Sequence, residues 1–255
     1  IKFRRTGHLE LLTLGGIILI FVLISFAQFK LPHYLNITIP LFAVLSASYL
    51  YGLYKAGDSK IWKFLLGSQI FIAILVILLS LLLSLWAFQI KPVAGYVLLS
   101  LGILVLIFYC FKKEDVFSRI VTISTCSAIV INSVMNLHFY PSLLEYQAGS
   151  TMAKIVRAEE IPATSIYKLT GGHTWSLDFY NREPVKKIEI QDLPQHQDIW
   201  LYLTDKELAA VRERGYDWDQ QFTVDQFRIT RLQARFLNPD TRSQVLNKMH
   251  LIHLY

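Results

Sequence analysis

Long apolar runs occupy the first 140 residues and limit what this chain can fold into. Five such runs are present, at about residues 11–29, 35–54, 61–90, 93–111 and 120–140. Each is close to or above the roughly 20 residues that an α-helix needs to cross the hydrocarbon core of a bilayer. Because lipid offers no hydrogen-bond partners to the backbone, such segments must be helical. We therefore expect residues 1–140 to form five transmembrane helices, the third of them long enough to tilt or protrude.

Composition also favours a membrane protein with a soluble part. The chain is 53% hydrophobic and only 17% charged, with a formal net charge of +6. The positive excess lies beside the apolar runs and the C-terminal part is nearly balanced, so nucleic acid is not an expected partner. Cys110 and Cys126 fall in or at the ends of apolar runs, where thiols act as small apolar side chains. Since residue 1 is Ile, we expect a piece of a longer protein. We expect no cleaved signal peptide, because the first apolar run is long enough to span a bilayer and no small-residue cleavage site follows it.

Basic residues predict the orientation of the runs. The N-terminus, the 55–63 loop and the 112–119 loop each carry three Lys or Arg residues, whereas the other two loops carry Lys30 and Lys91 alone. The positive-inside rule places the first three in the cytoplasm. With five crossings, the loop at Lys30 and everything after residue 140 then lie outside.

The fifth run is unusually polar for a lipid-facing helix. Its small or polar residues are Thr122, Ser124, Thr125, Ser127, Asn132, Ser133 and Asn136. Such residues suit close packing between helices. Asn136 and His138, near the outer end, are also candidates for lining a substrate cavity. Ionisable residues are otherwise scarce in the runs, which argues against a proton-driven transporter.

Residues 141–255 are typical of a small soluble α/β domain, large enough for its own core. Helical periodicity predicts a helix over 141–157, and shorter helices are expected over 175–181 and 205–214, the last capped by Thr204. Strands are expected at 165–169, 185–190, 199–203, 221–232 and 245–254.

This part of the sequence contains no established catalytic or metal-binding motif. His250 and His253 are three residues apart, which on a strand directs them to opposite faces and makes a metal pair unexpected. Asp217, Asp219 and Asp225 indicate a solvated, acidic loop. The sequence identifies no cofactor and leaves a divalent metal open.

A cation, an imidazole and a phenol stand together between the first two runs, at Lys30, His33 and Tyr34. Lys30 and Tyr34 can both donate hydrogen bonds to a phosphate oxygen. The same residues also suit an ordinary short loop, with a lysine that extends to water and an interfacial aromatic ring.

The segment Lys30-Leu31-Pro32-His33-Tyr34, followed by Pro40, resembles the K-L-P-H-Y segment of glycosyltransferase family 39. That family includes the lipid A aminoarabinose transferases and relatives of the protein O-mannosyltransferases. Residues 176–180 (S-L-D-F-Y), with Arg182, Pro184 and Val185, resemble a segment of the C-terminal domains of its bacterial members. The chain departs from the family at Ile37, near which relatives often carry a second proline.

The resemblance implies the C-terminal part of a GT-C enzyme of the bacterial inner membrane. Such an enzyme transfers a sugar from a polyprenyl-phosphate donor to a lipid or protein acceptor, and its C-terminal domain is periplasmic. Lys30, His33 and Tyr34 would contact the donor phosphate. The five helices would be the last of thirteen, and the catalytic acid would precede Ile1. The competing expectation is a non-enzymatic membrane protein that displays a periplasmic binding or assembly domain.

Overall fold

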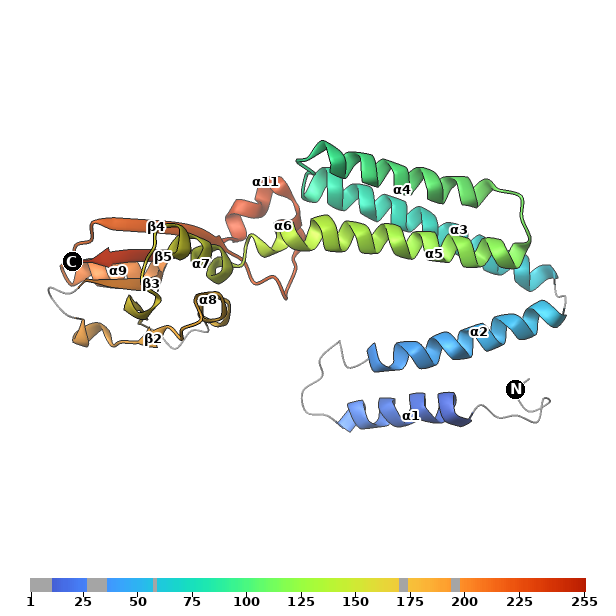
Figure 1. Cartoon of the computed structure of the whole chain (residues 1–255), viewed down its shortest axis with the longest axis horizontal. Helices are drawn as coiled ribbons and strands as arrows, with labels where there is room; N and C mark the ends of the chain where they lie inside the picture. Colours follow the sequence, from blue (N-terminus) through green and yellow to red (C-terminus); the bar gives the residue numbers. More distant parts are fainter. Residues whose placement is uncertain (1–10, 27–35, 57–58, 170–173, 194–197) are drawn as a thin grey trace. The chain divides into compact units, whose positions relative to one another are not determined.

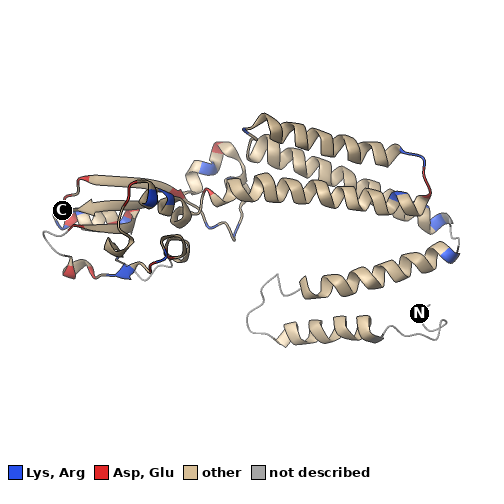
Figure 2. Ribbon diagram, in the orientation of Figure 1, with Lys and Arg blue, Asp and Glu red and all other residues tan. Residues whose placement is uncertain are grey.

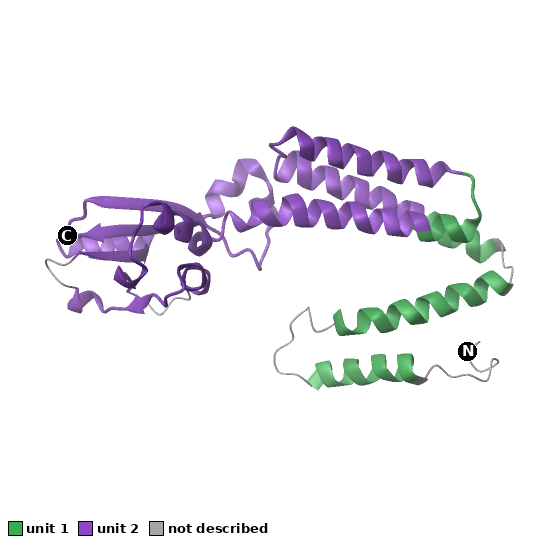
Figure 3. Cartoon of the chain, in the orientation of Figure 1, with its two compact units in different colours: residues 1–69, 113–121 green, residues 70–112, 122–255 purple. Residues whose placement is uncertain are grey.

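The structure is a computed structural model that describes residues 11–26, 36–56, 59–169, 174–193 and 198–255. The chain forms two compact units (Figure 3). Unit 1 comprises residues 1–69 and 113–121, and unit 2 comprises residues 70–112 and 122–255. The predicted division at residue 140 stays a prediction.

The N-terminal half consists of apolar helices (Figure 1). They are α1 (Leu11–Phe26), α2 (Ile39–Ala56), α3 (Ser59–Leu81), α4 (Val93–Phe111) and α5 (Val116–Val134). π-helical turns extend α3 over Leu82–Ala87 and α5 over Met135–Phe139, and α6 (Tyr140–Leu144) follows the second turn directly. Charged residues gather at the helix ends, leaving long uncharged stretches between them (Figure 2).

Four of these helical runs are long and apolar enough to cross a membrane: Asn36–Lys55, Lys60–Ala87, Val93–Phe111 and Val116–Leu144. They correspond to the second to fifth predicted spans. The run Leu12–Phe26 is shorter, and the rest of the first predicted span, residues 27–29, lies outside the described residues. In an apolar stretch of 18 residues within each long run, between 11% and 28% of the residues are buried, so most side chains there are at least partly exposed. An apolar surface of this extent is compatible with a lipid bilayer and unfavourable in water.

Aromatic side chains pack the helices of unit 1. Phe21 of α1 meets Phe42 of α2 edge to face, with ring centroids 6.5 Å apart. A second cluster gathers Tyr54, Trp62 and Phe117 at centroid separations of 5.4–6.4 Å. It lies beside the basic residues of the 55–63 loop.

Unit 2 continues from its apolar helices into a mixed five-stranded sheet of order β2-β1-β3-β5-β4. The strands are β1 (Ile166–Lys168), β2 (Lys186–Lys187), β3 (Ile199–Thr204), β4 (Gln220–Gln226) and β5 (Asn247–Leu254). β1 pairs in parallel with β2 and β3, whereas β5 pairs antiparallel with β3 and β4. The first five residues of β3, Ile199 to Leu203, are all buried, because helices cover both faces of this central strand.

Three helices cover the sheet. α7 (Ala148–Ala158) and α8 (Trp175–Asn181) pack on the face that carries Trp200 and Tyr202, and α9 (Asp205–Glu213) packs on the opposite face. Thr204 caps α9 in a capping box with Glu207, as its sequence predicts. Two short helices, α10 (Ala234–Leu237) and α11 (Pro239–Arg242), precede β5.

The predicted strand over 221–232 is too long. β4 ends at Gln226, because Phe227 leaves the sheet: its amide donates to Tyr146 O at 2.9 Å and its ring stacks on Phe236 at 3.8 Å. The predicted helix over 141–157 is likewise two helices, α6 and α7, separated by a turn after Leu144. The strand predicted over 185–190 is reduced to the two residues of β2.

Candidate functional site

The residues predicted to hold a donor phosphate, Lys30, His33 and Tyr34, lie outside the described residues. Their role stays a prediction. Among the described apolar helices, the candidate site is the end of α3 and α5 where both helices widen into π turns.

The π turn of α5 has a local cause in the sequence. Pro141 has no amide hydrogen, and its ring crowds the carbonyl about one turn earlier in a regular helix. The helix widens over Met135–Phe139, immediately before this proline, and then continues as α6. Such turns recur at functional sites in proteins.

The π turn of α3 ends without a following helical turn, so carbonyl oxygens at its end need donors from elsewhere. Leu83 O and Ser84 O accept from the amides of Phe88 and Ile90, each at 3.0 Å. Phe88 O, just past the end of this turn, accepts from His138 Nε2 at 2.5 Å. A carbonyl can only accept, so Nε2 carries the hydrogen in this contact. His138, on the second π turn, therefore joins α5 to the end of α3.

A cavity of about 410 Å³ lies between the ends of α3, α4 and α5. Its walls are largely apolar, and His138 is part of the lining. Gly102 of α4 permits the close packing beside it, since a Cβ there would lie 3.2 Å from Val130 Cγ2. A volume of this size suits an apolar ligand or a segment of a lipid chain.

Ser84 places a hydroxyl group in the wall of this apolar cavity. Its side chain lines the cavity and is fully buried, and its hydroxyl has no hydrogen-bond partner within the described part of the chain. Ser133 also lines the wall. A buried hydroxyl without a partner is costly, so Ser84 is available to a ligand that brings a polar group into the cavity.

Asn136, the other residue predicted to line a cavity, does not line this one. Its amide is exposed and donates to Asn132 O at 2.9 Å, as Asn132 donates to Ala128 O at 2.8 Å. Both amides thus bond to their own helix, which reduces the cost of facing an apolar surrounding.

Arg242 of α11 lies against the same end of α3. Its guanidinium donates to Ala87 O, to Phe236 O at 2.8 Å and to Leu237 O and the Tyr146 hydroxyl at 3.3 Å. It also stacks over the Phe88 ring, 4.2 Å from the centroid. No carboxylate among the described residues pairs with it. Sequence reasoning missed this contact, since nothing local in the sequence distinguishes Arg242 from an exposed arginine.

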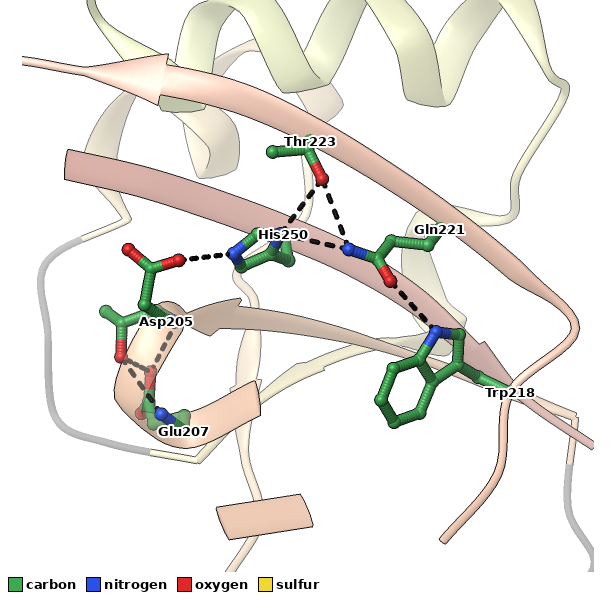
Figure 4. A network of polar contacts seen from close by, with 7 residues as sticks. Asp205, Glu207, Trp218, Gln221, Thr223 and His250 are labelled. Atoms are coloured by element: carbon green, nitrogen blue, oxygen red, sulfur yellow. Dashed lines mark hydrogen bonds and ion pairs between the residues drawn. The ribbon is translucent and has the colours of Figure 1, made fainter. Parts of the chain in front are cut away.

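A second polar cluster lies on the α9 face of the sheet (Figure 4). Trp218 Nε1 donates to Gln221 Oε1 at 2.9 Å, which orients that amide toward Thr223 Oγ1 at 3.3 Å and His250 Nδ1 at 3.2 Å. Thr223 Oγ1 also lies 2.9 Å from His250 Nδ1. Because the Gln221 amide nitrogen can only donate, His250 Nδ1 accepts, and His250 Nε2 donates to Asp205 Oδ1 at 2.9 Å. This hydrogen bond from His250 lowers the pKa of the Asp205 carboxyl.

The cluster serves as a structural clamp. His250 is buried, and its partners come from β4 and from the first residue of α9. His253 points to the other face, as the strand spacing predicts. Its ring contacts that of Trp200 in a tilted arrangement, with centroids 4.8 Å apart. Its two ring nitrogens contact Asp198 at 2.5 Å and Asp219 at 2.7 Å. Asp217 and Asp219 are exposed and lie between α9 and β4, whereas Asp225 belongs to β4, so the predicted acidic loop is wrong for Asp225 alone.

Across the described ranges, no group of three His, Cys, Asp or Glu side chains could hold a metal ion. Comparison of the chain with protein-family models, curated proteins and solved structures returned no match.

Proposed function

We propose that this chain is the C-terminal part of an integral-membrane glycosyltransferase. The enzyme would move a sugar from a polyprenyl-phosphate donor to a lipid or protein acceptor at the periplasmic face of a bacterial inner membrane. The observation that carries the proposal is the Lys30-Leu31-Pro32-His33-Tyr34 segment, because it places a cation, an imidazole and a phenol between two apolar runs.

In this proposal Lys30 and Tyr34 bind the phosphate of the donor. Transfer leaves negative charge on that phosphate, and a nearby ammonium and phenol would stabilise it electrostatically. His33 lies between them and would supply a further donor. The residue that activates the acceptor is not assigned to this chain.

The cavity between α3, α4 and α5 supports a lipid-linked donor. A polyprenyl chain needs an apolar channel, and the cavity walls are apolar apart from a few side chains, among them Ser84, Ser133 and His138. These groups would contact the first, more polar end of the chain. The remaining walls would contact its isoprene units.

A non-enzymatic binding protein is the second candidate, and one observation favours it. Trp175 and Phe179 of α8 are 72% and 76% exposed, and they lie one helical turn apart. An exposed aromatic pair on a soluble domain is typical of a surface that binds a partner.

The test is sugar transfer by the purified full-length protein in nanodiscs, with a panel of radiolabelled undecaprenyl-phosphate-linked sugars. Loss of a charge-assisted hydrogen bond of about 1.5–3 kcal/mol predicts that Lys30→Met lowers transfer roughly ten- to hundredfold. Lys30→Arg should retain part of the activity, and Tyr34→Phe should be milder because it removes one hydroxyl.

Lys91→Met is the matched control, since Lys91 is the single cation of the other loop predicted to be external. It should transfer sugar as the wild type does. If Lys30→Met transfers sugar at the wild-type rate, the segment is an ordinary loop without a role in binding the donor phosphate. Absence of transfer from every donor in the panel would favour the binding protein instead.

A further inference from the structure

A groove of about 490 Å³ with charged, polar and apolar lining lies where the apolar helices lead into the α/β domain. One part of its wall comes from the end of α6 and the following turn, with Pro141, Leu144 and Glu145. Another comes from α7, with Lys154 and Arg157, and Tyr180 of α8 completes it. We propose that this groove binds the phosphate headgroup of an anionic phospholipid of the surrounding bilayer.

The depth of the groove fits that ligand. The apolar helical run Val116–Leu144 contains 29 residues. At 1.5 Å per residue it is roughly 43 Å long, which equals the thickness of a bilayer with both headgroup layers, about 40–45 Å. Pro141 and Leu144, at its end, therefore lie at the level of the lipid headgroups. The groove opens at the depth at which a phospholipid presents its phosphate.

The charge of the groove also suits the phosphate headgroup of an anionic phospholipid. Lys154 and Arg157 are three residues apart on α7, so both extend from one side of the helix. Both are exposed, and neither pairs with a carboxylate in the described part of the chain. Arg157 uses one nitrogen in a 3.4 Å contact with Tyr180 O, which leaves further guanidinium donors for a ligand. With Glu145 as the single acid in the lining, the groove carries a net positive charge.

The remaining polar groups also match a headgroup. Ser150 lines the groove and donates its hydroxyl to Gln147 O at 2.9 Å, so its oxygen still accepts. Glu145 can accept hydrogen bonds from the hydroxyls of a glycerol headgroup. Trp175, exposed on the neighbouring α8, and Tyr180 in the lining are residue types enriched at the boundary between lipid and water. The proposal requires insertion in a membrane but not sugar transfer.

The test uses the full chain in nanodiscs that contain phosphatidylglycerol and phosphatidylcholine in equal amounts, without any sugar donor. Tyr180 is replaced by the photoreactive p-benzoylphenylalanine, and mass spectrometry identifies the lipid that attaches on illumination. We expect phosphatidylglycerol to attach in preference. Lys154→Gln/Arg157→Gln should lower that adduct roughly 25-fold, about fivefold for each cation. The exchange Lys154→Arg/Arg157→Lys should keep it.

Lys206→Gln/Arg214→Gln is the matched control, because it removes the same charge from exposed positions at α9, on the other face of the sheet. It should leave the adduct unchanged, and circular dichroism should show that both double variants fold. Equal attachment of the two lipids, or an adduct that survives Lys154→Gln/Arg157→Gln, would overturn the proposal. Displacement by excess inorganic phosphate would also overturn it, since the groove would then bind free phosphate rather than a membrane lipid.

Discussion

Arg242→Met should destabilise the junction between α3 and the soluble domain. Methionine keeps an apolar stem of similar length but leaves the partly buried Ala87 O without its donor. That unpaired carbonyl should cost about 1–3 kcal/mol. Loss of the stacking over Phe88 should cost about 0.5–2 kcal/mol more. Relief of guanidinium desolvation offsets part of this, so we expect a net loss of about 2–3 kcal/mol.

A thermal melt of the detergent-solubilised chain measures this effect. A loss of that size corresponds to a fall of roughly 4–12 °C in the midpoint for a chain of this length. A thiol-reactive dye can follow unfolding at Cys126, a half-buried free cysteine that lines the cavity beside the junction. Lys in place of Arg242 should give an intermediate midpoint, because an ammonium keeps the charge but not the planar set of donors.

Arg235→Met provides the control, since Arg235 is an exposed arginine on the adjacent α10. Its midpoint should stay within about 1–2 °C of the wild type, as for most surface substitutions. If Arg242→Met melts no lower than Arg235→Met, the contacts to Ala87 and Phe88 contribute nothing measurable, and the reasoning is refuted.

Two further predictions concern the soluble domain. Burial disfavours protonation of His253, but its hydrogen bonds to Asp198 and Asp219 outweigh this and raise its pKa from 6.5. The stability that this interaction adds is fully present below pH 6.5 and is lost as the pH rises through the raised pKa, so the melting midpoint should fall above pH 6.5. Asp198→Asn/Asp219→Asn should flatten that fall. An unchanged dependence of the midpoint on pH in this variant would contradict the assignment. Gly149→Ala should lower the free energy of unfolding in urea by about 1 kcal/mol net, because the new Cβ would lie 2.3 Å from a serine hydroxyl of α8 and 3.1 Å from a backbone nitrogen. Gly67→Ala is the control: a Cβ there meets open space, so this change should be neutral or stabilising.

Elements with a strong local signal could be predicted from the sequence. The four long apolar helices follow from run length alone, and the predicted 93–111 span coincides with α4. The buried strand at Ile199 and the cap at Thr204 also follow from neighbouring residues, because a capping box needs only the side chains of positions three apart.

Features that depend on distant partners could not be predicted. The 221–232 segment alternates in the manner of a strand, but Phe227 gains more from stacking on Phe236 and bonding to Tyr146 than from a longer ladder. In the same way, the polarity of the fifth run drew attention to Asn136 and His138 together. Their spacing of two residues places them on nearly opposite sides of the helix. That His138 contacts Phe88 and the cavity, while Asn136 is exposed, depends on the end of α3 and not on the local sequence.

The end of α3 links the cavity to the soluble domain, since two consecutive carbonyls there take donors from different places. Ala87 O accepts from Arg242, 155 residues further along the chain, and Phe88 O accepts from His138, 50 residues further along. One helical turn is thus held from two sides, by His138 in the cavity wall and by Arg242 of α11.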